Sequence, residues 1–332
     1  MKYLIWSFIF VNTFAHAEPY IPNDNDVIAT SSTPLAATLT LQELATLFEQ
    51  TQYVGQTESK QGLLKRYLEQ QVNTSDDPEI LYYYARVLQR EHQFDEALAF
   101  LASVKELSPH HVNAALLTAN ILMVQGKFDD AKSECLNLIG HASIETVTTC
   151  SLDAQSQTGK LEESFQALKK IARKETMSLN TRHVLAEMAF RLNKPEQTID
   201  YLETVNLKNS PVSLVVLWAD AHLAMNNLDT VLSTLSALLD DSANLEDAIL
   251  LRLAQAEKYK VDNQSNKWRL KLKERIVLRE LRQDLFHASD LAWYYLTIEE
   301  NQSKARYWAN INWKHAKMDS DKQLLKLAND ID

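Results

Sequence analysis

The chain has 332 residues, enough for one large domain or two ordinary ones. Glycine and proline together make up under 4% of it, where average proteins have about 12%, and this excludes folds that need many tight turns, such as β-sandwiches, barrels and doubly wound sheets. Hydrophobic residues, at 45%, exclude a wholly disordered chain, and the net charge of −10 argues against a general nucleic-acid binder, because phosphates need Lys and Arg to displace their counterions.

The first 17 residues have the pattern of a secretory signal peptide. Lys2 is a short positive segment, residues 3–11 are almost all apolar, and Ala15-His16-Ala17 fits a cleavage site. The apolar run of about nine residues is too short to span about 30 Å of hydrocarbon, although an uncleaved anchor or a buried helix remains the alternative. No cysteine directly follows it, which argues against a lipid anchor. We expect cleavage after Ala17, a bacterial periplasmic location and no transmembrane helix.

A leader and a first pair of helices are expected before the regular part of the chain. Residues 18–39 contain no Lys or Arg and are rich in Pro, Asn, Asp, Ser and Thr, which predicts a flexible leader. Thr40 and Glu43 have the spacing of a capping box, and residues 62–72 carry apolar side chains at helical spacing. We therefore predict a degenerate N-terminal helix pair over residues 40–77.

A turn phrase recurs through the middle of the chain. Phe94 has equivalents at positions 128, 161, 195 and 228, at intervals of 34, 33, 34 and 33 residues. The small residues Ala85 and Ala97 recur one unit later as Ala119 and Ala131. The five phrases read HQFDEA, GKFDDA, GKLEES, NKPEQT and NNLDTV. Each unit is predicted to be a helix pair that cannot bury its apolar face alone, so that neighbouring pairs stack around a continuous core.

Residues of the first unit stand at fixed places in this helix pair: Tyr84, Ala85, Leu88, Phe94, Ala97 and Pro109. In this arrangement the chain resembles the tetratricopeptide repeat family. The resemblance implies an all-α fold, a right-handed α-solenoid of antiparallel helix pairs, with repeats over residues 78–242 and degenerate pairs and a C-terminal helical cap over residues 243–332. The chain departs from the family pattern at Leu152, Pro195 and Val231, which puts the register after residue 145 in doubt.

The resemblance also implies a concave groove, lined by the first helix of each unit, that binds a protein partner. The residues carried over to this groove are Tyr82, Tyr83, Arg86, Arg90, Asn120, Met123, His183, Glu187 and Arg191. Tyr82 and Tyr83 are expected to offer flat contact area, and Asn120 hydrogen bonds to an extended peptide.

Arg86 and Arg90 lie one helical turn apart on the same helix face. Two guanidinium groups at this spacing are suited to hold a carboxylate in forked geometry. The alternative is that they pair with local acids, such as Glu79 and Glu91, and form a solvated face.

Cys135 and Cys150 are the two cysteines of the chain. A disulfide between them would close a loop of about 15 residues and contribute roughly 3 kcal/mol to stability through chain entropy. Two buried thiols are the alternative, and the sequence leaves both open.

The last third of the chain differs in charge and aromatic content. Residues 209–251 hold six acids and no Lys or Arg, whereas residues 252–282 hold ten basic and four acidic residues. The basic segment is either a solvated helix face or a surface for an acidic partner or anionic lipid headgroups. The tryptophan-rich end is expected to be a cap that seals the solenoid, with a docking patch for a partner or a glycan as the alternative.

Signatures of catalysis are absent from the sequence. It holds no G-x-G-x-x-G, P-loop, G-x-S-x-G, H-E-x-x-H or C-x-x-C motif, and His110-His111 is expected to be a solvated turn rather than a metal site. We predict a noncatalytic scaffold or adaptor of the periplasm, without cofactor or metal, that binds another envelope protein or peptide. A small-molecule or nucleic-acid ligand is not expected.

The alternative function is that of an enzyme or enzyme subunit acting on cell-wall glycan. Its general acid would be Glu280, Glu299 or Glu300 in an aromatic cleft of the last third. A saccharide-binding module at the aromatic C-terminal end, without turnover, is the remaining alternative.

Overall fold

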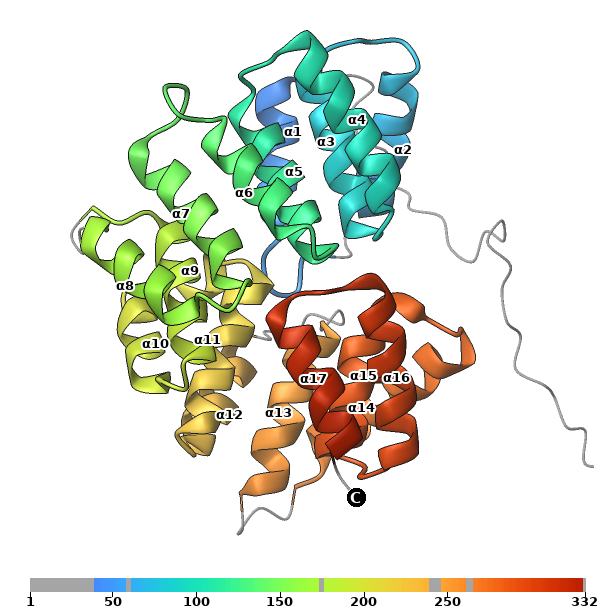
Figure 1. Cartoon of the computed structure of the whole chain (residues 1–332). Coiled ribbons are helices and arrows are strands. Elements are labelled where there is room, and N and C mark those ends of the chain that lie inside the picture. The colour runs from blue at the N-terminus through green and yellow to red at the C-terminus, as the bar shows by residue number, and fades with distance from the viewer. Residues whose placement is uncertain (1–38, 58–60, 173–175, 239–245, 261–264, 331–332) are drawn as a thin grey trace, which may run out of the picture. The chain divides into compact units, whose positions relative to one another are not determined.

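Helices are the only regular secondary structure in the described part of the chain (Figure 1). The computed structural model describes residues 39–57, 61–172, 176–238, 246–260 and 265–330, all within one compact unit, Pro34–Asp332. In these ranges the only β-type pairings are two isolated bridges, so the predicted all-α fold class is confirmed. The predicted signal peptide and all but the last residue of the predicted leader lie outside the described residues.

Seventeen α-helices and two short 3₁₀ helices follow one another within the described ranges. The helices are α1 Leu41–Gln50, α2 Gln61–Val72, α3 Pro78–Arg90, α4 Phe94–Leu107, α5 Val112–Val124, α6 Phe128–Leu136, α7 Ile144–Ser156, α8 Leu161–Ile171, α9 Leu179–Arg191, α10 Pro195–Leu202, η1 Leu207–Asn209, α11 Val212–Ala224, α12 Leu228–Leu238, α13 Asp247–Tyr259, α14 Lys267–Leu281, η2 Leu285–His287, α15 Ala288–Thr297, α16 Gln302–His315 and α17 Asp319–Asp330.

The recurring phrase marks the turn inside each helix pair. Its first residue adopts a left-handed backbone in all five units, with φ between 56° and 83°: His92, Gly126, Gly159, Asn193 and Asn226. Two residues later the second helix begins, at positions 94, 128, 161, 195 and 228. The left-handed residue turns the chain back at the end of the first helix, as Gly and Asn commonly do. The register is therefore regular past residue 145.

Small side chains line the seam between the paired helices. Ala85, Ala97, Ala119 and Ala131 are completely buried, and the later units bury Ser164, Thr198 and Val231 at the place of Ala97. The absence of a large side chain lets two helix backbones approach closely. Pro195, a departure from the family pattern, is tolerated because it stands in the first turn of α10, where its missing N–H costs no hydrogen bond.

Local sequence signals define the ends of the first helices. Thr40 caps α1, and the side chains of Thr40 and Glu43 bond to each other's backbone as the capping box predicts. Asp77 caps α3, with Pro78 in its first turn. Residues 267–281 of the basic segment form helix α14.

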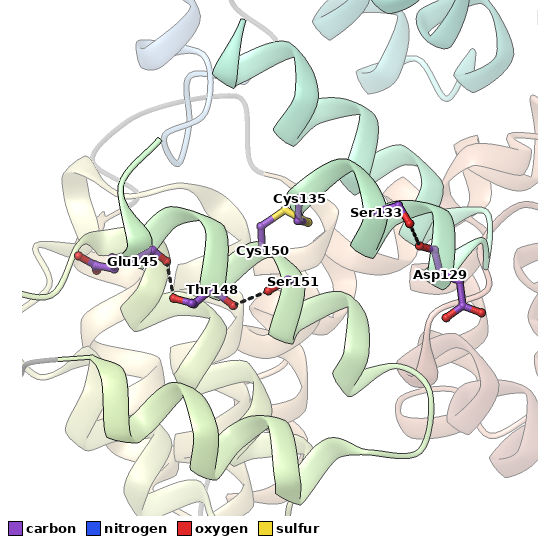
Figure 2. Close-up of a disulfide and its surroundings, with 7 residues drawn as sticks. All are labelled: Asp129, Ser133, Cys135, Glu145, Thr148, Cys150 and Ser151. Carbon is purple, nitrogen blue, oxygen red and sulfur yellow. Dashed lines mark hydrogen bonds between the residues drawn. A yellow bond between two sulfur atoms is a disulfide. The ribbon is translucent and has the colours of Figure 1, made fainter. Parts of the chain in front are cut away.

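A disulfide joins two neighbouring units. Cys135 on α6 and Cys150 on α7 point toward each other across the helix interface, with their Cα atoms 5.6 Å apart (Figure 2). Both residues are buried together with Ala119 and Ala154. Because α6 closes the second unit and α7 opens the third, the bond fixes the stacking of these two units.

The loop that follows α1 reaches helices far along the chain. Gln52 accepts a backbone hydrogen bond from Val212 at 3.0 Å, at the start of α11. Glu246, just before α13, accepts hydrogen bonds from the backbone of Gly55 at 2.9 Å and from the hydroxyl of Thr57 at 2.8 Å. The N-terminal helix pair is thus tied to the fifth unit and to the helix pair after it.

The connection between α16 and α17 also returns to the repeats. The Lys317 amide donates to the carbonyl of Val124 at 2.8 Å, beside the turn at Gly126. A Cβ atom at position 126 would lie 2.8 Å from the Lys317 Cβ, so this contact requires glycine. The Asp319 amide donates to Gln157 Oε1 at 3.0 Å. The C-terminal helices are therefore anchored to the second and third units.

None of the helices in the described ranges has the length and apolarity that a membrane-spanning helix needs.

The disulfide is expected to add measurably to stability. Replacing both Cys135 and Cys150 by Ser should lower the free energy of unfolding by about 3 kcal/mol, because the unfolded chain regains the freedom of a loop of about 15 residues. Urea unfolding of the oxidised protein and of the double variant measures the difference. An unchanged midpoint and slope would contradict a structural role for this bond.

Candidate functional site

The inner-face positions expected from the repeat pattern form a graded row of polar residues. The ninth residue of the successive units is Arg86, Asn120, Asp153, Glu187 and Asp220. The charge at this position therefore changes from positive in the first unit to negative in the last three. Two groups along this row carry the strongest electrostatic features, one around Arg86 and one around Glu187.

Arg86 and Arg90 form the first group, on the last two turns of α3. Their guanidinium carbons lie 5.1 Å and 5.3 Å from the ring centroid of Phe48 on α1, so both cations stack against one aromatic ring. Arg90 donates one hydrogen bond to the Thr51 hydroxyl at 2.6 Å and a longer one, at 3.4 Å, to the Phe48 carbonyl. These contacts orient the pair but do not neutralise it.

The acids expected to neutralise this pair have other partners. Glu79 lies 3.1 Å from the His111 ring, and Glu91 lies 2.7 Å from the Lys65 ammonium. Within the described ranges, neither Arg86 nor Arg90 has a carboxylate partner. Burial and the neighbouring Arg86 lower the pKa of Arg90 to about 10, as expected for a cation that lacks a counter-charge.

A cavity of about 300 Å³ opens beside Arg90. It lies where the loop after α1, the start of α2, the end of α3 and the start of α11 meet, and six of its eight lining residues carry hydroxyl, amide or guanidinium groups. The lining residues are Thr51, Gln52, Thr57, Gln61, Arg90, Pro211, Val212 and Ser213. The described lining thus offers hydrogen-bond donors and a positive charge without a carboxylate, which suits an anionic group.

Three residues expected in the groove are part of the core. Tyr82 and Tyr83 are each 8% exposed, because Tyr83 stacks on Phe48 of α1 and Tyr82 packs against His111 of the next unit. Met123 is buried beside the disulfide. The expectation that the tyrosines offer flat contact area to a partner is corrected accordingly. Asn120 is exposed, as a groove residue must be.

The second group joins residues of α7 and α9. His183, Glu187 and Arg191 stand on one face of α9, and Asp153 and Gln157 face them from the end of α7. The structure therefore brings the three residues predicted for the fourth unit together and adds two from the third.

Arg191 is the most connected residue of this second group. Its guanidinium donates to the Ser156 hydroxyl at 2.8 Å, to the Ser156 carbonyl at 3.1 Å and to Asp319 Oδ2 at 3.3 Å. Arg191 thus holds the N-terminus of α17 against the repeats and is not free for a partner. The predicted binding role of Arg191 gives way to a structural one.

Asp153 has the most unusual environment of the second group. Burial and the nearby carboxylate of Glu187 raise the pKa of Asp153 to about 7, although Arg191 and a hydrogen bond from Gln157 act in the opposite direction. Burial also lowers the pKa of His183, with Glu187 opposing it. The group therefore contains one carboxyl, that of Asp153, whose charge depends on pH near neutrality.

Five of the ten basic residues in the segment 252–282 pair with acids of the preceding helices. Asp247, which is buried, accepts hydrogen bonds from Arg275 and Arg279 at 2.8 Å each. Asp220 binds Arg252 through both of its carboxylate oxygens, again at 2.8 Å. The uneven distribution of charge along the sequence thus reflects ion pairing between adjacent helices.

Of the three carboxylates proposed for glycan hydrolysis, Glu280 lines a cavity of about 460 Å³ together with Tyr307 and Trp308, whereas Glu299 and Glu300 do not have the environment of a general acid. A hydrogen bond from Tyr294 and the nearby Lys273 lower the pKa of Glu299, and a hydrogen bond from Lys258 lowers that of Glu300. Glu280 pairs with Lys304 at 3.1 Å. A general acid needs a raised pKa, so Glu299 and Glu300 do not support this alternative.

The histidine pair has structural contacts. His111 caps α5 by accepting a hydrogen bond from the Ala114 amide at 3.2 Å, and His110 stacks on His141 with ring centroids 3.6 Å apart. His110 is exposed in the turn as expected, whereas the side chain of His111 is buried at the start of α5, so the expectation of a solvated turn is corrected for His111 alone. In the described ranges no three His, Cys, Asp or Glu side chains converge as metal ligands would.

Comparison with known proteins agrees with the helix-pair pattern. Residues 54–137 match the family described as anaphase-promoting complex, cyclosome, subunit 3, whose repeats are tetratricopeptide-like. No curated protein sequence matches the chain.

Two solved structures are similar over most of their length. One is a tetratricopeptide repeat protein from Parabacteroides merdae ATCC 43184, with 12% identity, 87% of this chain and 98% of that chain covered, and a TM-score of 0.37. The other is the TPR domain of P58(IPK), with 16% identity, 87% and 97% covered, and a TM-score of 0.29. At these scores the fold assignment rests on the chain's own helix pairs.

Asp153 is expected to make stability depend on pH. Folded Asp153 keeps its proton up to about pH 7, whereas an unfolded aspartate loses it near pH 3.9. Between these values the folded state binds more protons, so this group lowers the free energy of unfolding as pH rises. Asp153→Asn should therefore gain stability relative to the wild type from about pH 4 to about pH 7, and the gain should be constant above that.

Urea unfolding at a series of pH values measures this difference. Asp130→Asn, which removes an exposed charge in the first turn of α6, is the control. A stability difference between Asp153→Asn and the wild type that stays constant from pH 4 to pH 8 would show that Asp153 ionises normally.

Proposed function

For a chain built of tetratricopeptide-like repeats, we propose the function of a noncatalytic scaffold in the bacterial periplasm that binds another envelope protein through the inner face of its helix pairs. The repeat fold itself is typical of protein–protein interaction modules. The periplasmic location is supported by the signal-peptide pattern of residues 1–17 and by the disulfide, since disulfides persist in oxidising compartments.

The observation that carries the proposal is the cationic pair Arg86 and Arg90, which has no carboxylate partner in the described part of the chain and of which Arg90 lines a cavity. A buried cation without a counter-charge is costly, and a ligand that brings a carboxylate into the cavity removes that cost. Arg90 is already held in place by Thr51 and Phe48, so little side-chain entropy is lost on binding. An acidic segment of the partner fits this site.

Segments that are far apart in the sequence line the cavity together. The loop after α1 supplies Thr51, Gln52 and Thr57 to the lining, and the start of α11 supplies Ser213 from the opposite side. The binding site is therefore built between distant units and depends on their contact. A partner segment that enters it contacts both ends of the repeat array at once.

Removing the two guanidinium groups should weaken binding of an acidic segment. Arg86→Ala with Arg90→Ala is expected to reduce the affinity for a short poly-glutamate peptide at least about tenfold, since a hydrogen bond to a charged group contributes about 1.5–3 kcal/mol. Fluorescence anisotropy of the labelled peptide measures the dissociation constant. The same double variant should recover less of a discrete partner from envelope extracts.

Arg306→Ala is the matched control, because it removes an arginine from an exposed position on α16. Urea unfolding of each variant checks that loss of the Thr51 contact has not unfolded the first helix pair. Arg90→Lys is a second check, because it keeps the positive charge at this position. Equal affinities for the wild type, the double variant and Arg306→Ala would remove the cavity from the proposed function.

A further inference from the structure

Helix α14 exposes a stripe of large hydrophobic side chains. Leu270, Val277, Leu278 and Leu281 are between 44% and 52% exposed. Every other α-helix in the described ranges exposes at most one large hydrophobic side chain to this extent, and the short helix η2 exposes Leu285 and Phe286. An apolar surface concentrated on one helix of a soluble fold indicates an interaction surface.

The stripe lies opposite the side of α14 that packs on the protein. Trp268, Leu272 and Ile276 follow one another at intervals of four and are buried in the core shared with α13. At 100° per residue, Leu270 and Leu281 fall on the other side of the helix from this buried row. The exposed leucines are therefore not the margin of the core but a second apolar face.

The second helices of the earlier units do not share this feature. Where α14 exposes leucine, α8 exposes Glu162 and Glu163 in its first turn and Lys169 and Lys170 in its last. The second helix of a pair thus also has an exposed outer face in α8, but that face is charged, whereas the outer face of α14 is apolar.

Basic side chains without acidic partners border the stripe. Ion pairs occupy Arg269 and Arg279, but Lys267, Lys271 and Arg282 have no carboxylate partner in the described part of the chain. Lys267 and Lys271 instead lie over the Trp268 ring, 4.3 Å and 5.5 Å from its centroid. On the helix these cations fall next to Leu270, Leu278 and Leu281.

One acidic residue, Glu274, stands on the same side of the helix between Leu270 and Leu278. The outward side of α14 therefore keeps a net positive charge in a chain whose total charge is −10. A partner that receives this side has to be both apolar and anionic.

We propose that α14 binds the surface of a membrane that contains anionic lipids. In this arrangement the helix lies parallel to the bilayer, with its leucines directed toward the acyl chains and Lys267, Lys271 and Arg282 at the level of the phosphates. Long basic side chains bordering an apolar stripe match this boundary, because their aliphatic stems follow the apolar region while their charges remain among the headgroups. The membrane surface is a second site, separate from the cavity at Arg90.

The test is cosedimentation of the purified protein with vesicles. Vesicles containing phosphatidylglycerol should bind the protein at low salt, vesicles of phosphatidylcholine alone should bind it at least about tenfold more weakly, and added salt should weaken the first interaction because it screens the charges. Lys267→Glu with Lys271→Glu, and separately Leu270→Ser with Leu278→Ser, should each reduce binding at least about tenfold. Glu274→Gln should increase it.

Lys169→Glu with Lys170→Glu is the matched control, because it makes the same charge change on the outer end of α8 and should leave binding unchanged. Circular dichroism and urea unfolding of each variant check that the helix content and stability of the protein are retained, and the leucine variants retain both lysines over Trp268. Absence of binding to phosphatidylglycerol vesicles overturns the proposal. An equal loss of vesicle binding in the α14 and α8 lysine variants also overturns it. The same holds if α14 binds a soluble acidic protein that the vesicles do not displace.

Discussion

Close approach of paired helices at small side chains is the constraint on which the rest of the structure depends. Ala85 and Ala97 in the first unit, and Ala119 and Ala131 in the second, have no exposed surface. A larger side chain at these places would push the helices apart and move every later unit, since each unit contacts mainly its neighbours. The disulfide between Cys135 and Cys150 holds one of these interfaces covalently.

Stacking in register brings distant segments together and so creates the polar sites. Helix α3 presents Arg90 to a cavity that also needs Ser213 from α11. In the same way α9 presents Arg191 to Asp319 of the C-terminal helix. Contacts within the chain occupy part of the predicted inner face, as at Arg191, whereas the cationic pair of the first unit has no carboxylate partner in the described ranges.

Features that depend on a few adjacent residues could be predicted from the sequence. The turn phrase predicted the start of each second helix because a left-handed residue followed by a helix-starting residue is a local signal, as at Gly126 and Phe128. The capping box at Thr40 was predictable for the same reason.

Features that depend on long-range packing could not be predicted in this way. Tyr83 is buried because α1 lies against it, and no signal near Tyr83 in the sequence indicates this contact. Asp153 was missed although the repeat phase places it at the same position as Arg86 and Glu187, and applying the groove positions to the third unit would have found it. Its raised pKa depends on burial, which the pattern alone does not give.

The most direct measurement of the central claim is the stability of variants that enlarge the seam. Ala119→Leu should lower the free energy of unfolding by about 1–3 kcal/mol, because the extra methyl groups have no space between the paired helices. Ala102→Leu makes the same change at an exposed position of α4 and should leave stability within about 0.5 kcal/mol of the wild type. Equal unfolding curves for the two variants would contradict stacking at the alanine seam.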